Sequence, residues 1–259
     1  MTSTHVPSTS DRTQILPWAV LGAALLQVVA PLVTLLGPGT SPGGGSGPDL
    51  LITPVGWAFS IWGVIYTLAI AQAVAELRAG TTGSSPRRQV AQVVLYVGGA
   101  VWIGLAGLDS SVATAAALLV MAGAALVAVV AVVREPLAPR WFSLLTRASV
   151  GLYAGWVTAA LFLNLSTAAV DVAGLDAGRA SWQIAVLVVA AVTLVGFTVV
   201  TGGTLGYVLA GVWALFGITV TARSDGSDAI ASAAVAGAVA LAAAALVTRL
   251  TAPRSPARS

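Results

Sequence analysis

The chain is poor in the residue types on which much enzyme and cofactor chemistry depends. Its 259 residues include no Lys and no Cys, and the one His, His5, lies near the N-terminus. Without Lys no Schiff base can attach a cofactor such as retinal. Without Cys there is no disulfide, thiolate nucleophile or Cys-ligated metal. We therefore expect neither enzyme activity nor a bound metal or protein-held cofactor.

Charge is also scarce, at 8% of residues, whereas a soluble domain carries about a quarter. Hydrophobic residues make up 58% of the chain and its mean hydropathy is +0.94. These values predict an all-α, polytopic integral membrane protein in contact with the lipid bilayer. Because the net charge is only +3 and the Arg residues are scattered, no nucleic-acid partner is expected. Arg without Lys, with abundant Ala, Val and Gly, is typical of GC-rich coding and points to a bacterial cell membrane.

Eight apolar stretches are long enough to cross a bilayer, because about 20 apolar residues span its hydrocarbon layer. They cover residues 15–36, 54–77, 89–107, 112–133, 148–170, 182–201, 204–222 and 228–250. A polar tail, 1–14, precedes them, a Gly/Pro/Ser loop, 37–53, follows the first, and a basic tail, 251–259, ends the chain. Gly202-Gly203 predicts a tight turn between the sixth and seventh spans. Fusing these two spans would leave seven.

The basic residues predict the orientation of the eight spans. If both termini are cytoplasmic, ten of the 12 basic residues lie inside: Arg12, Arg78, Arg87, Arg88, Arg134, Arg140, Arg147, Arg249, Arg254 and Arg258. Only Arg179 and Arg223 lie outside. An excess of basic residues in cytoplasmic loops is the usual pattern. We therefore expect both termini in the cytoplasm.

The second span carries an aromatic stripe. Phe59, Trp62 and Tyr66 recur at three- and four-residue steps, which places them on one face of a helix. Pro54 is expected at the first turn, where a missing N–H costs little. Interfacial anchoring and ordinary packing explain part of this pattern. Trp62 and Tyr66 lie deeper than an interface, which leaves an aromatic wall of a binding site as the second interpretation.

The fifth span carries a similar stripe. Tyr153, Trp156, Ala160 and Asn164 step by three, four and four residues, so a helix would place them on one face. An apolar groove with a few polar groups is typical of a small-molecule pocket. The interior of a packed bundle has the same composition, and the pattern alone does not separate the two.

The remaining polar residues of the spans are amides and hydroxyls. No acid, base or His is expected well inside a span, which argues against a proton pump or an acid-dependent exchanger. The polar set is expected to form hydrogen bonds between helices and comprises Gln27, Gln72, Gln92, Thr158 and Asn164. Two pairs of small residues, Gly151 with Gly155 and Gly202 with Gly206, offer surfaces for close helix packing.

The second and fifth spans resemble the tryptophan-rich sensory proteins, which are related to the mitochondrial translocator protein (the peripheral-type benzodiazepine receptor). That family's second helix follows a Pro-rich stretch and carries a W-G-x-x-Y-like pattern, matched here by Pro54 and by Trp62-Gly63-Val64-Ile65-Tyr66. Its fifth helix has the spacing of Tyr153, Trp156, Ala160 and Leu163-Asn164, and Trp102 matches a Trp of its third helix. The resemblance covers about residues 15–170. The cholesterol-type Tyr-Arg motif of that fifth helix has no counterpart in 165–170.

The resemblance implies a five-helix translocator-like bundle at 15–170, to which 182–250 adds three helices. It also implies a membrane protein that binds a flat hydrophobic small molecule, tetrapyrrole-like, in a sensory or regulatory role. The ligand-binding residues that it implies are Trp62, Tyr66, Trp102, Tyr153, Trp156, Ala160 and Asn164. The aromatics would stack on the ligand, Ala160 would leave room, and Asn164 would supply a hydrogen bond.

A porphyrin in such a bundle would be held non-covalently and by shape, because the bundle has no His or Cys to act as an axial ligand. A permease for a small uncharged solute is the competing function. A membrane partner or assembly protein without a ligand is the third. A second copy of the chain is a further candidate partner.

Overall fold

The structure is a computed structural model that describes residues 9–36, 48–78 and 83–251. The described part contains eight α-helices and one short 3₁₀ helix, and no strand. In chain order these are α1 (Thr9–Leu36), η1 (Gly56–Ser60), α2 (Ile61–Arg78), α3 (Pro86–Ala106), α4 (Ser111–Arg134), α5 (Arg140–Ala173), α6 (Ala180–Val200), α7 (Leu205–Ser224) and α8 (Asp228–Thr251). All eight α-helices are long and apolar enough to cross a membrane. The prediction of an all-α protein with eight spans is confirmed.

Helices α1 and α5 begin well before the spans expected from the sequence. Helix α1 begins at Thr9, so part of the expected polar tail is helical, and residues 1–8, 37–47 and 252–259 lie outside the described residues. Helix α5 begins at Arg140, inside the expected basic connection, and its 34 residues extend over about 51 Å. The added turns of α5 are amphipathic, because Phe142 and Thr146 are fully buried while Trp141 and Leu144 are exposed. Burial of that face makes the segment helical despite its charges.

The start of the second span is not an α-helix. Residues 56–60 form η1, and Pro54 precedes it instead of lying in the first turn of α2. The segment is held against α7, because Val55 N–H donates to the carbonyl oxygen of Gly217 (3.2 Å) and Trp213 Nε1 donates to that of Ala58 (2.8 Å). These two bonds to α7 account for the tighter helix. They also give Trp213, to which the sequence assigns no role, a structural one.

The turn between α6 and α7 is as tight as the glycines predict. Gly202 and Gly203 have φ values of +64° and +71°, a region that favours glycine. Helices α6 and α7 are therefore separate, and the interpretation with seven spans is wrong.

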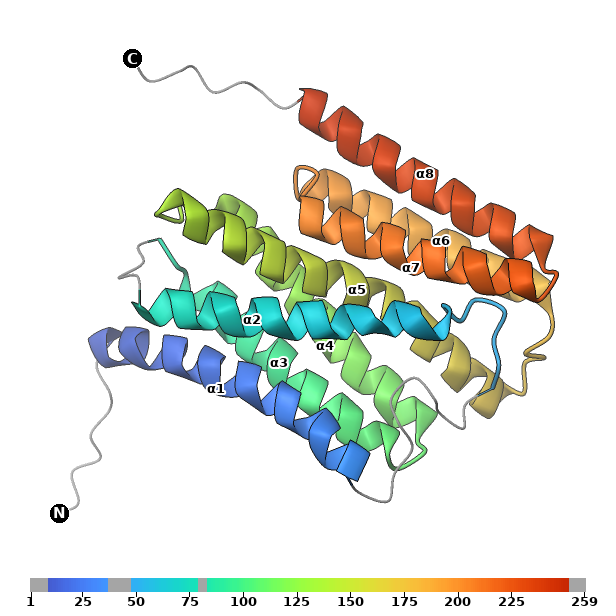
Figure 1. The fold of residues 1–259 in the computed structure, drawn as a ribbon, viewed down its shortest axis with the longest axis horizontal. Coiled ribbons are helices and arrows are strands. Elements are labelled where there is room, and N and C mark those ends of the chain that lie inside the picture. Colours follow the sequence, from blue (N-terminus) through green and yellow to red (C-terminus); the bar gives the residue numbers. More distant parts are fainter. Residues whose placement is uncertain (1–8, 37–47, 79–82, 252–259) are drawn as a thin grey trace.

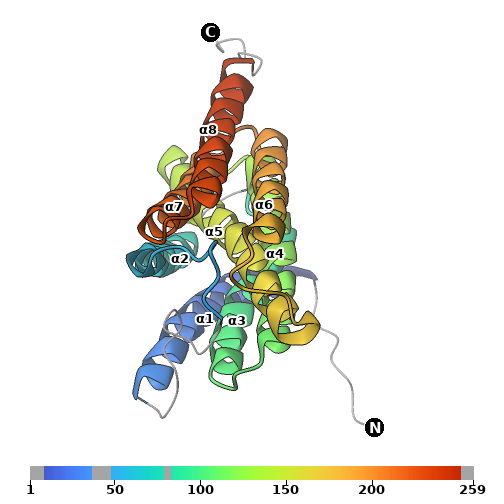
Figure 2. The same ribbon diagram turned by 90° about the vertical axis from the view of Figure 1, so that its right-hand side faces the viewer.

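Five helices close into a ring (Figure 2). Neighbours around the ring are α1, α2, α5, α4 and α3, and α3 returns to α1. Sequence order is therefore not spatial order: α5 lies between α2 and α4. Helix α7 packs on the outer side of α5, and α8 packs on α6 and α7. The candidate site lies where the ring meets this second group of helices.

The two ends of the bundle differ in charge. Because the helices alternate in direction, α1 begins and α8 ends at the same end (Figure 1). This basic end carries Arg78, Arg87, Arg88, Arg134, Arg140, Arg147 and Arg249. The opposite, acidic end carries Asp49, Asp109, Asp171, Asp176, Asp225 and Asp228, together with Arg179 and Arg223. The charge asymmetry counted along the sequence is therefore also an asymmetry in space.

Helices α5 and α7 approach each other backbone to backbone. A Cβ on Gly206 would lie 2.7 Å from the carbonyl oxygen of Ala148, and one on Gly155 would overlap the carbonyl oxygen of Tyr207. A Cβ on Gly151 would lie 2.9 Å from the Thr204 methyl group. The prediction of close packing is confirmed for Gly151 and Gly155. It is wrong for the pair Gly202 and Gly206, because Gly202 has no neighbour within 4 Å and serves the turn.

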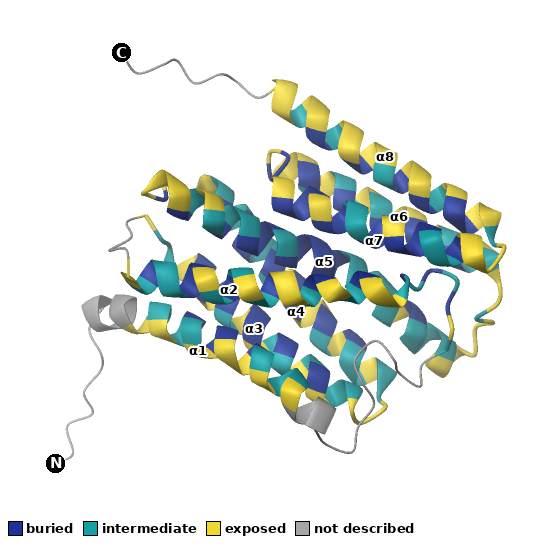
Figure 3. Cartoon of the chain, in the orientation of Figure 1, coloured by how far each residue is buried: buried dark blue, intermediate teal, exposed yellow. Residues whose placement is uncertain are grey.

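The outer faces of the helices are apolar. Large aliphatic side chains such as Leu25, Val101, Leu119, Val192 and Leu246 are exposed, and exposed residues recur along every helix (Figure 3). Surfaces of this kind are costly in water and suited to lipid. The chain is a multi-span membrane protein in contact with the bilayer.

Candidate functional site: an aromatic cluster inside the helix ring

Trp62 of α2 is the centre of a cluster of five rings contributed by α2, α3 and α5. Its ring stacks on Trp102 at a centroid distance of 5.9 Å and lies 5.5 Å from Tyr66. It meets Tyr153 and Trp156 edge to face, at 5.7 and 6.2 Å. Trp62 and Trp156 therefore lie on facing surfaces, and the two motif helices face one another as the sequence predicts. Aromatic pairs at these distances and angles are favourable beyond the area that they bury.

Two polar contacts fix the edges of the cluster. Trp102 Nε1 donates to Asn164 Oδ1 at 3.2 Å, so the predicted amide does lie beside the predicted Trp. Tyr153 donates its hydroxyl to Gln27 Oε1 of α1 at 2.9 Å. Gly99 of α3 makes room for that hydroxyl, because a Cβ there would lie 2.9 Å from it. The cluster is thus tied to α1, α3 and α5 by directional bonds.

The structure brings most of the predicted residues together but divides the stripe on α5. Tyr153 and Asn164 face α3, where they meet Tyr96 and Trp102. Ala160 instead faces α6 and α7 and lines a cavity there. The residues of one stripe cover enough of a helix's circumference to touch two neighbouring helices. Their spacing in the sequence does not show which residue faces which helix.

Two further aromatic residues belong to the cluster. Tyr96 stacks on Tyr153 at 5.5 Å, and Phe59 meets Trp156 edge to face at 5.7 Å. Phe59 is part of the predicted stripe on the second span but not of the predicted site. Tyr96 lies in the third span, four residues after Gln92. This spacing places the two side chains on one helix face and could have indicated Tyr96 from the sequence.

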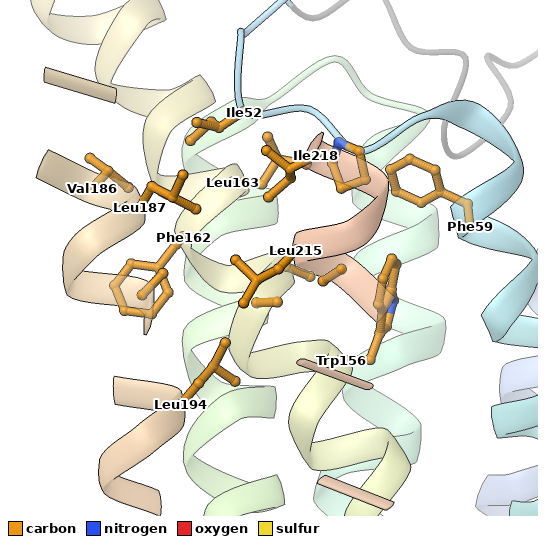
Figure 4. A pocket seen from close by; sticks show the side chains of 15 residues that line it. Ile52, Phe59, Trp156, Phe162, Leu163, Val186, Leu187, Leu194, Leu215 and Ile218 are labelled. Atoms are coloured by element: carbon orange, nitrogen blue, oxygen red, sulfur yellow. The ribbon is translucent and has the colours of Figure 1, made fainter. Parts of the chain in front are cut away.

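An apolar cavity adjoins the cluster on the outer side of Trp156. Its volume is about 40 Å³, and it lies between the segment from Ile52 to Phe59, α5, α6 and α7. Figure 4 shows side chains such as Phe162, Leu187, Leu215 and Trp156 converging on it. Trp156 therefore separates this cavity from the aromatic cluster. Helices α6 and α7, outside the expected five-helix site, supply half of the walls.

Two buried donors at the cluster have no acceptor. Trp156 Nε1 and Gln27 Nε2 are buried, and neither has a hydrogen-bond partner among the described residues. Buried polar groups in proteins are nearly always paired, and the exceptions call for a specific explanation. An acceptor group supplied from outside the chain is one such explanation.

Comparison with protein families matches the chain to TSPO-like protein over residues 17–247. The chain belongs to the TSPO-like protein family. The match runs beyond the five spans whose motifs carry the resemblance, so α6, α7 and most of α8 are part of the matched TSPO-like region. Neither curated proteins nor solved structures gave a match.

This TSPO-like chain also contains a buried ionic cluster at the basic end of the ring. Arg88 Nη2 donates to Glu76 Oε1 at 2.6 Å, and Arg88 Nε donates to Glu135 Oε2 at 2.8 Å. The side chains of Arg88, Glu76 and Glu135 are 0%, 1% and 7% exposed. Ser85 donates to Glu135, and Arg88 also donates to Gln92. One guanidinium thus links α2, α3 and the residue that follows α4.

The ionic cluster corrects one expectation from the sequence. Arg88 was expected in a loop, but α3 begins at Pro86 and points this side chain into the ring. The expectation that no acid or base lies well inside a span is not contradicted by this cluster, because Glu76 is in the last turn of α2, Arg88 in the first turn of α3 and Glu135 just after α4. Mutual pairing makes the burial tolerable, because each charge keeps a partner when it leaves water.

A chain of amides continues from the ionic cluster toward the aromatic one. Gln72 donates to Glu76 (2.8 Å), and Gln92 donates to Gln72 (2.8 Å) and to Tyr96 (3.0 Å). The four-residue steps 72–76 and 88–92–96 place these groups on single helix faces. Such polar steps at helical spacing are the signal by which the network can be found from sequence. The predicted hydrogen bonding of Gln72 and Gln92 between helices is confirmed.

Chemically, the site is suited to binding an apolar molecule. Among the described side chains, no three of His, Cys, Asp or Glu come together as a metal site. The rings of the cluster offer flat apolar contacts, and Asn164 and Gln27 offer amides.

Proposed function

We propose that this TSPO-like membrane protein binds a flat hydrophobic small molecule, tetrapyrrole-like, against the aromatic cluster. The proposed role is sensory or regulatory and involves binding rather than catalysis. Trp62, Tyr66, Trp102, Tyr153 and Trp156 supply ring faces, and Asn164 supplies a hydrogen bond. Ala160 leaves room on the side of α6 and α7.

The observation that carries the proposal is the pair of buried donors without acceptors, Trp156 Nε1 and Gln27 Nε2, beside five clustered rings. Ordinary packing accounts for the rings but not for two unpaired buried donors, each of which costs free energy. A planar ligand that carries carbonyl or carboxylate oxygens would satisfy both and would stack on the rings. A purely hydrocarbon ligand would leave the donors unpaired.

The proposal includes an opening movement. The cavity of about 40 Å³ is far smaller than the ~300–1,000 Å³ of typical ligand pockets. Trp156 and Phe59 both line this cavity and touch each other, so rotation of the Trp156 side chain would open the cavity toward the cluster. Separation of α5 from α6 would enlarge it further. Ligand binding is then coupled to the contact between the ring and the C-terminal helices, which offers a way to signal occupancy.

We further propose a bacterial plasma-membrane location with the basic end, and hence both termini, in the cytoplasm. The concentration of arginines at one end of the bundle supports this orientation.

The test is equilibrium titration of the purified full-length protein in detergent with metal-free protoporphyrin, followed by porphyrin absorbance. Saturable binding is expected, with similar affinity for the zinc porphyrin, because the site has no His or Cys to act as an axial ligand. Trp62→Ala should weaken binding several-fold through loss of ring contact. Trp18→Ala, at a 65% exposed Trp on α1, is the matched control and should leave binding unchanged.

Equal binding by both variants would place the ligand elsewhere. Absence of saturable binding together with accumulation of a small uncharged solute in proteoliposomes would favour the permease. Absence of both would favour an assembly role without a ligand.

A further inference from the structure

A second hollow lies at the basic end, where the ring meets the C-terminal helices. This Arg groove has a volume of about 680 Å³ and is formed by the end of α4, the early turns of α5, the α6–α7 turn and the end of α8. Arg134, Arg147 and Arg249 line it, one from each of α4, α5 and α8. No Asp or Glu is among its lining residues. Three cations therefore face one space without a counter-charge in its walls.

The charges of the groove are not neutralised elsewhere in the described structure. Both ion pairs among the described residues are made by Arg88, which lies outside the groove. Arg147 Nε is buried and has no hydrogen-bond partner. Arg249 Nε donates to the carbonyl oxygen of Gly203 at 2.8 Å, which holds its guanidinium beside the α6–α7 turn. An anion in the groove would supply the missing acceptor and counter-charge.

The start of α7 adds backbone donors to the groove. Leu205 and Gly206 line the groove, and the first N–H groups of a helix have no partner within it. Thr204, which precedes α7, makes no side-chain cap, and its hydroxyl donates to the carbonyl oxygen of Thr201 (2.9 Å). These N–H groups are further donors in the groove beside the three arginines.

The mouth of the groove is apolar. Leu144, Val200 and Leu205 line it and are 55–60% exposed, so the hollow opens onto the lipid-facing surface. A small soluble anion would use the arginines and leave these side chains uncovered. An amphiphile, with an anionic head and acyl chains, would use both parts. Basic pockets between transmembrane helices are known sites for anionic lipid headgroups.

We propose that the Arg groove binds the phosphate headgroup of an anionic phospholipid, with the acyl chains along Leu144, Val200 and Leu205. Planar guanidinium groups suit this role because they bind phosphate oxygens in a bidentate manner. The bound lipid bridges α4 and α5 of the ring to α8, which otherwise packs on α6 and α7. The C-terminal helices thereby gain a function as one wall of a lipid site, independent of any ligand at the aromatic cluster.

Native mass spectrometry of the full-length protein in neutral detergent tests the proposal, with phosphatidylglycerol and phosphatidylcholine added in equal amounts. The wild-type protein should retain one phosphatidylglycerol in preference to phosphatidylcholine. The double variant Arg147→Gln/Arg249→Gln should reduce that retention about tenfold or more, through loss of two charge-assisted contacts. Arg134→Gln, at an exposed residue whose loss leaves the buried packing intact, should reduce it several-fold and covers the case in which the double variant does not fold.

The matched control is Arg78→Gln/Arg87→Gln, which removes the same charge from exposed positions at the same end but outside the groove. It should retain the lipid as the wild type does. Equal retention by all variants, or equal loss in Arg134→Gln and the control, would overturn the proposal. Inorganic phosphate, added without lipid, should not raise the melting temperature as phosphatidylglycerol does. An equal rise would assign the groove to a soluble anion and overturn the lipid assignment.

Discussion

The contacts inside the ring of α1 to α5 differ in kind from those that join α7, of the group α6 to α8, to the ring. Inside the ring, large aromatic and polar side chains meet in specific pairs, such as Trp62 with Trp102 and Arg88 with Glu76. Helix α7 instead meets α5 through glycines, and Gly155 and Gly206 bring backbones into contact. The first kind of packing needs particular atoms at particular places. The second needs only the absence of a side chain.

The difference between these two kinds of packing indicates where a ligand can bind. Glycine contacts leave little free space, and the Tyr207 hydroxyl donates to Thr158 Oγ1 across the contact (3.3 Å), so the α5–α7 contact is a scaffold. The ring interior retains unpaired donors and flat apolar surfaces, which are the features of a binding site. Both kinds of packing meet at Trp156, which touches Trp62 and Phe59 on one side and lines the cavity beside α6 and α7 on the other.

The largest expected effect is in a test of whether the two regions share one orientation in the membrane. A cysteine-labelling experiment gives an all-or-none result at each position. Single cysteines are introduced as Ser224→Cys at the acidic end and Thr251→Cys at the basic end, both exposed positions in a chain without Cys. With the basic end cytoplasmic, an impermeant thiol reagent added to intact cells should label position 224 and spare position 251. Labelling of position 251 alone would reverse the orientation, and labelling of both would separate the topology of the C-terminal helices from that of the ring.

Arg88→Gln should cause the largest loss of stability. It leaves Glu76 and Glu135 buried without their cation, and removal of one partner from a buried ion pair costs about 3–5 kcal/mol. Thermal unfolding in detergent measures the loss. Arg87→Gln, at the adjacent exposed residue, is the control and should change little. If the two variants melt alike, the ionic cluster does not hold the basic end of the ring.

Gly155→Ala tests the scaffold. The added methyl overlaps the carbonyl oxygen of Tyr207 and should cost about 1–3 kcal/mol as α5 and α7 are forced apart. Gly123→Ala in α4 has no neighbour within 4 Å and should be neutral or stabilising by up to about 1 kcal/mol, because Ala favours helix. Opposite signs in thermal unfolding are the expected result. Two small effects of the same sign would show that the glycines of α5 are not required for its contact with α7.

Trp156→Ala and Asn164→Ala should have the smallest effects on ligand binding, although Trp156→Ala also removes a buried ring and should cost about 3–5 kcal/mol of stability. Loss of one stacked ring or one amide hydrogen bond is worth on the order of 1 kcal/mol, which raises the dissociation constant for protoporphyrin several-fold. Trp182→Ala is the control, since its Nε1 donates to the carbonyl oxygen of Asp176 at the acidic end (2.9 Å). If the two α5 variants fail to accumulate in the membrane while the control does, these residues serve packing alone.

Much of this architecture follows from the sequence. Apolar length gives the spans, since a bilayer requires about 20 apolar residues to cross it. The helical steps of Trp62 with Tyr66, and of Tyr153 with Trp156, predict ring surfaces that the structure does bring face to face. Gly202-Gly203 predicts the turn that makes the number of spans even. Each of these features depends on residues close together in the sequence, so the sequence alone is enough to predict it.

Tertiary structure decided the rest. Only the ring order, with α5 between α2 and α4, brings Trp102 to Asn164 and directs Ala160 toward α6 and α7. Only the fold turns Arg88 from an expected loop residue into a buried cation between Glu76 and Glu135, and gathers Arg134, Arg147 and Arg249 around one groove. The physical reason is that apolar spans are interchangeable in lipid. Which of them become neighbours is set by side-chain pairing and close backbone contact between helices far apart in the sequence.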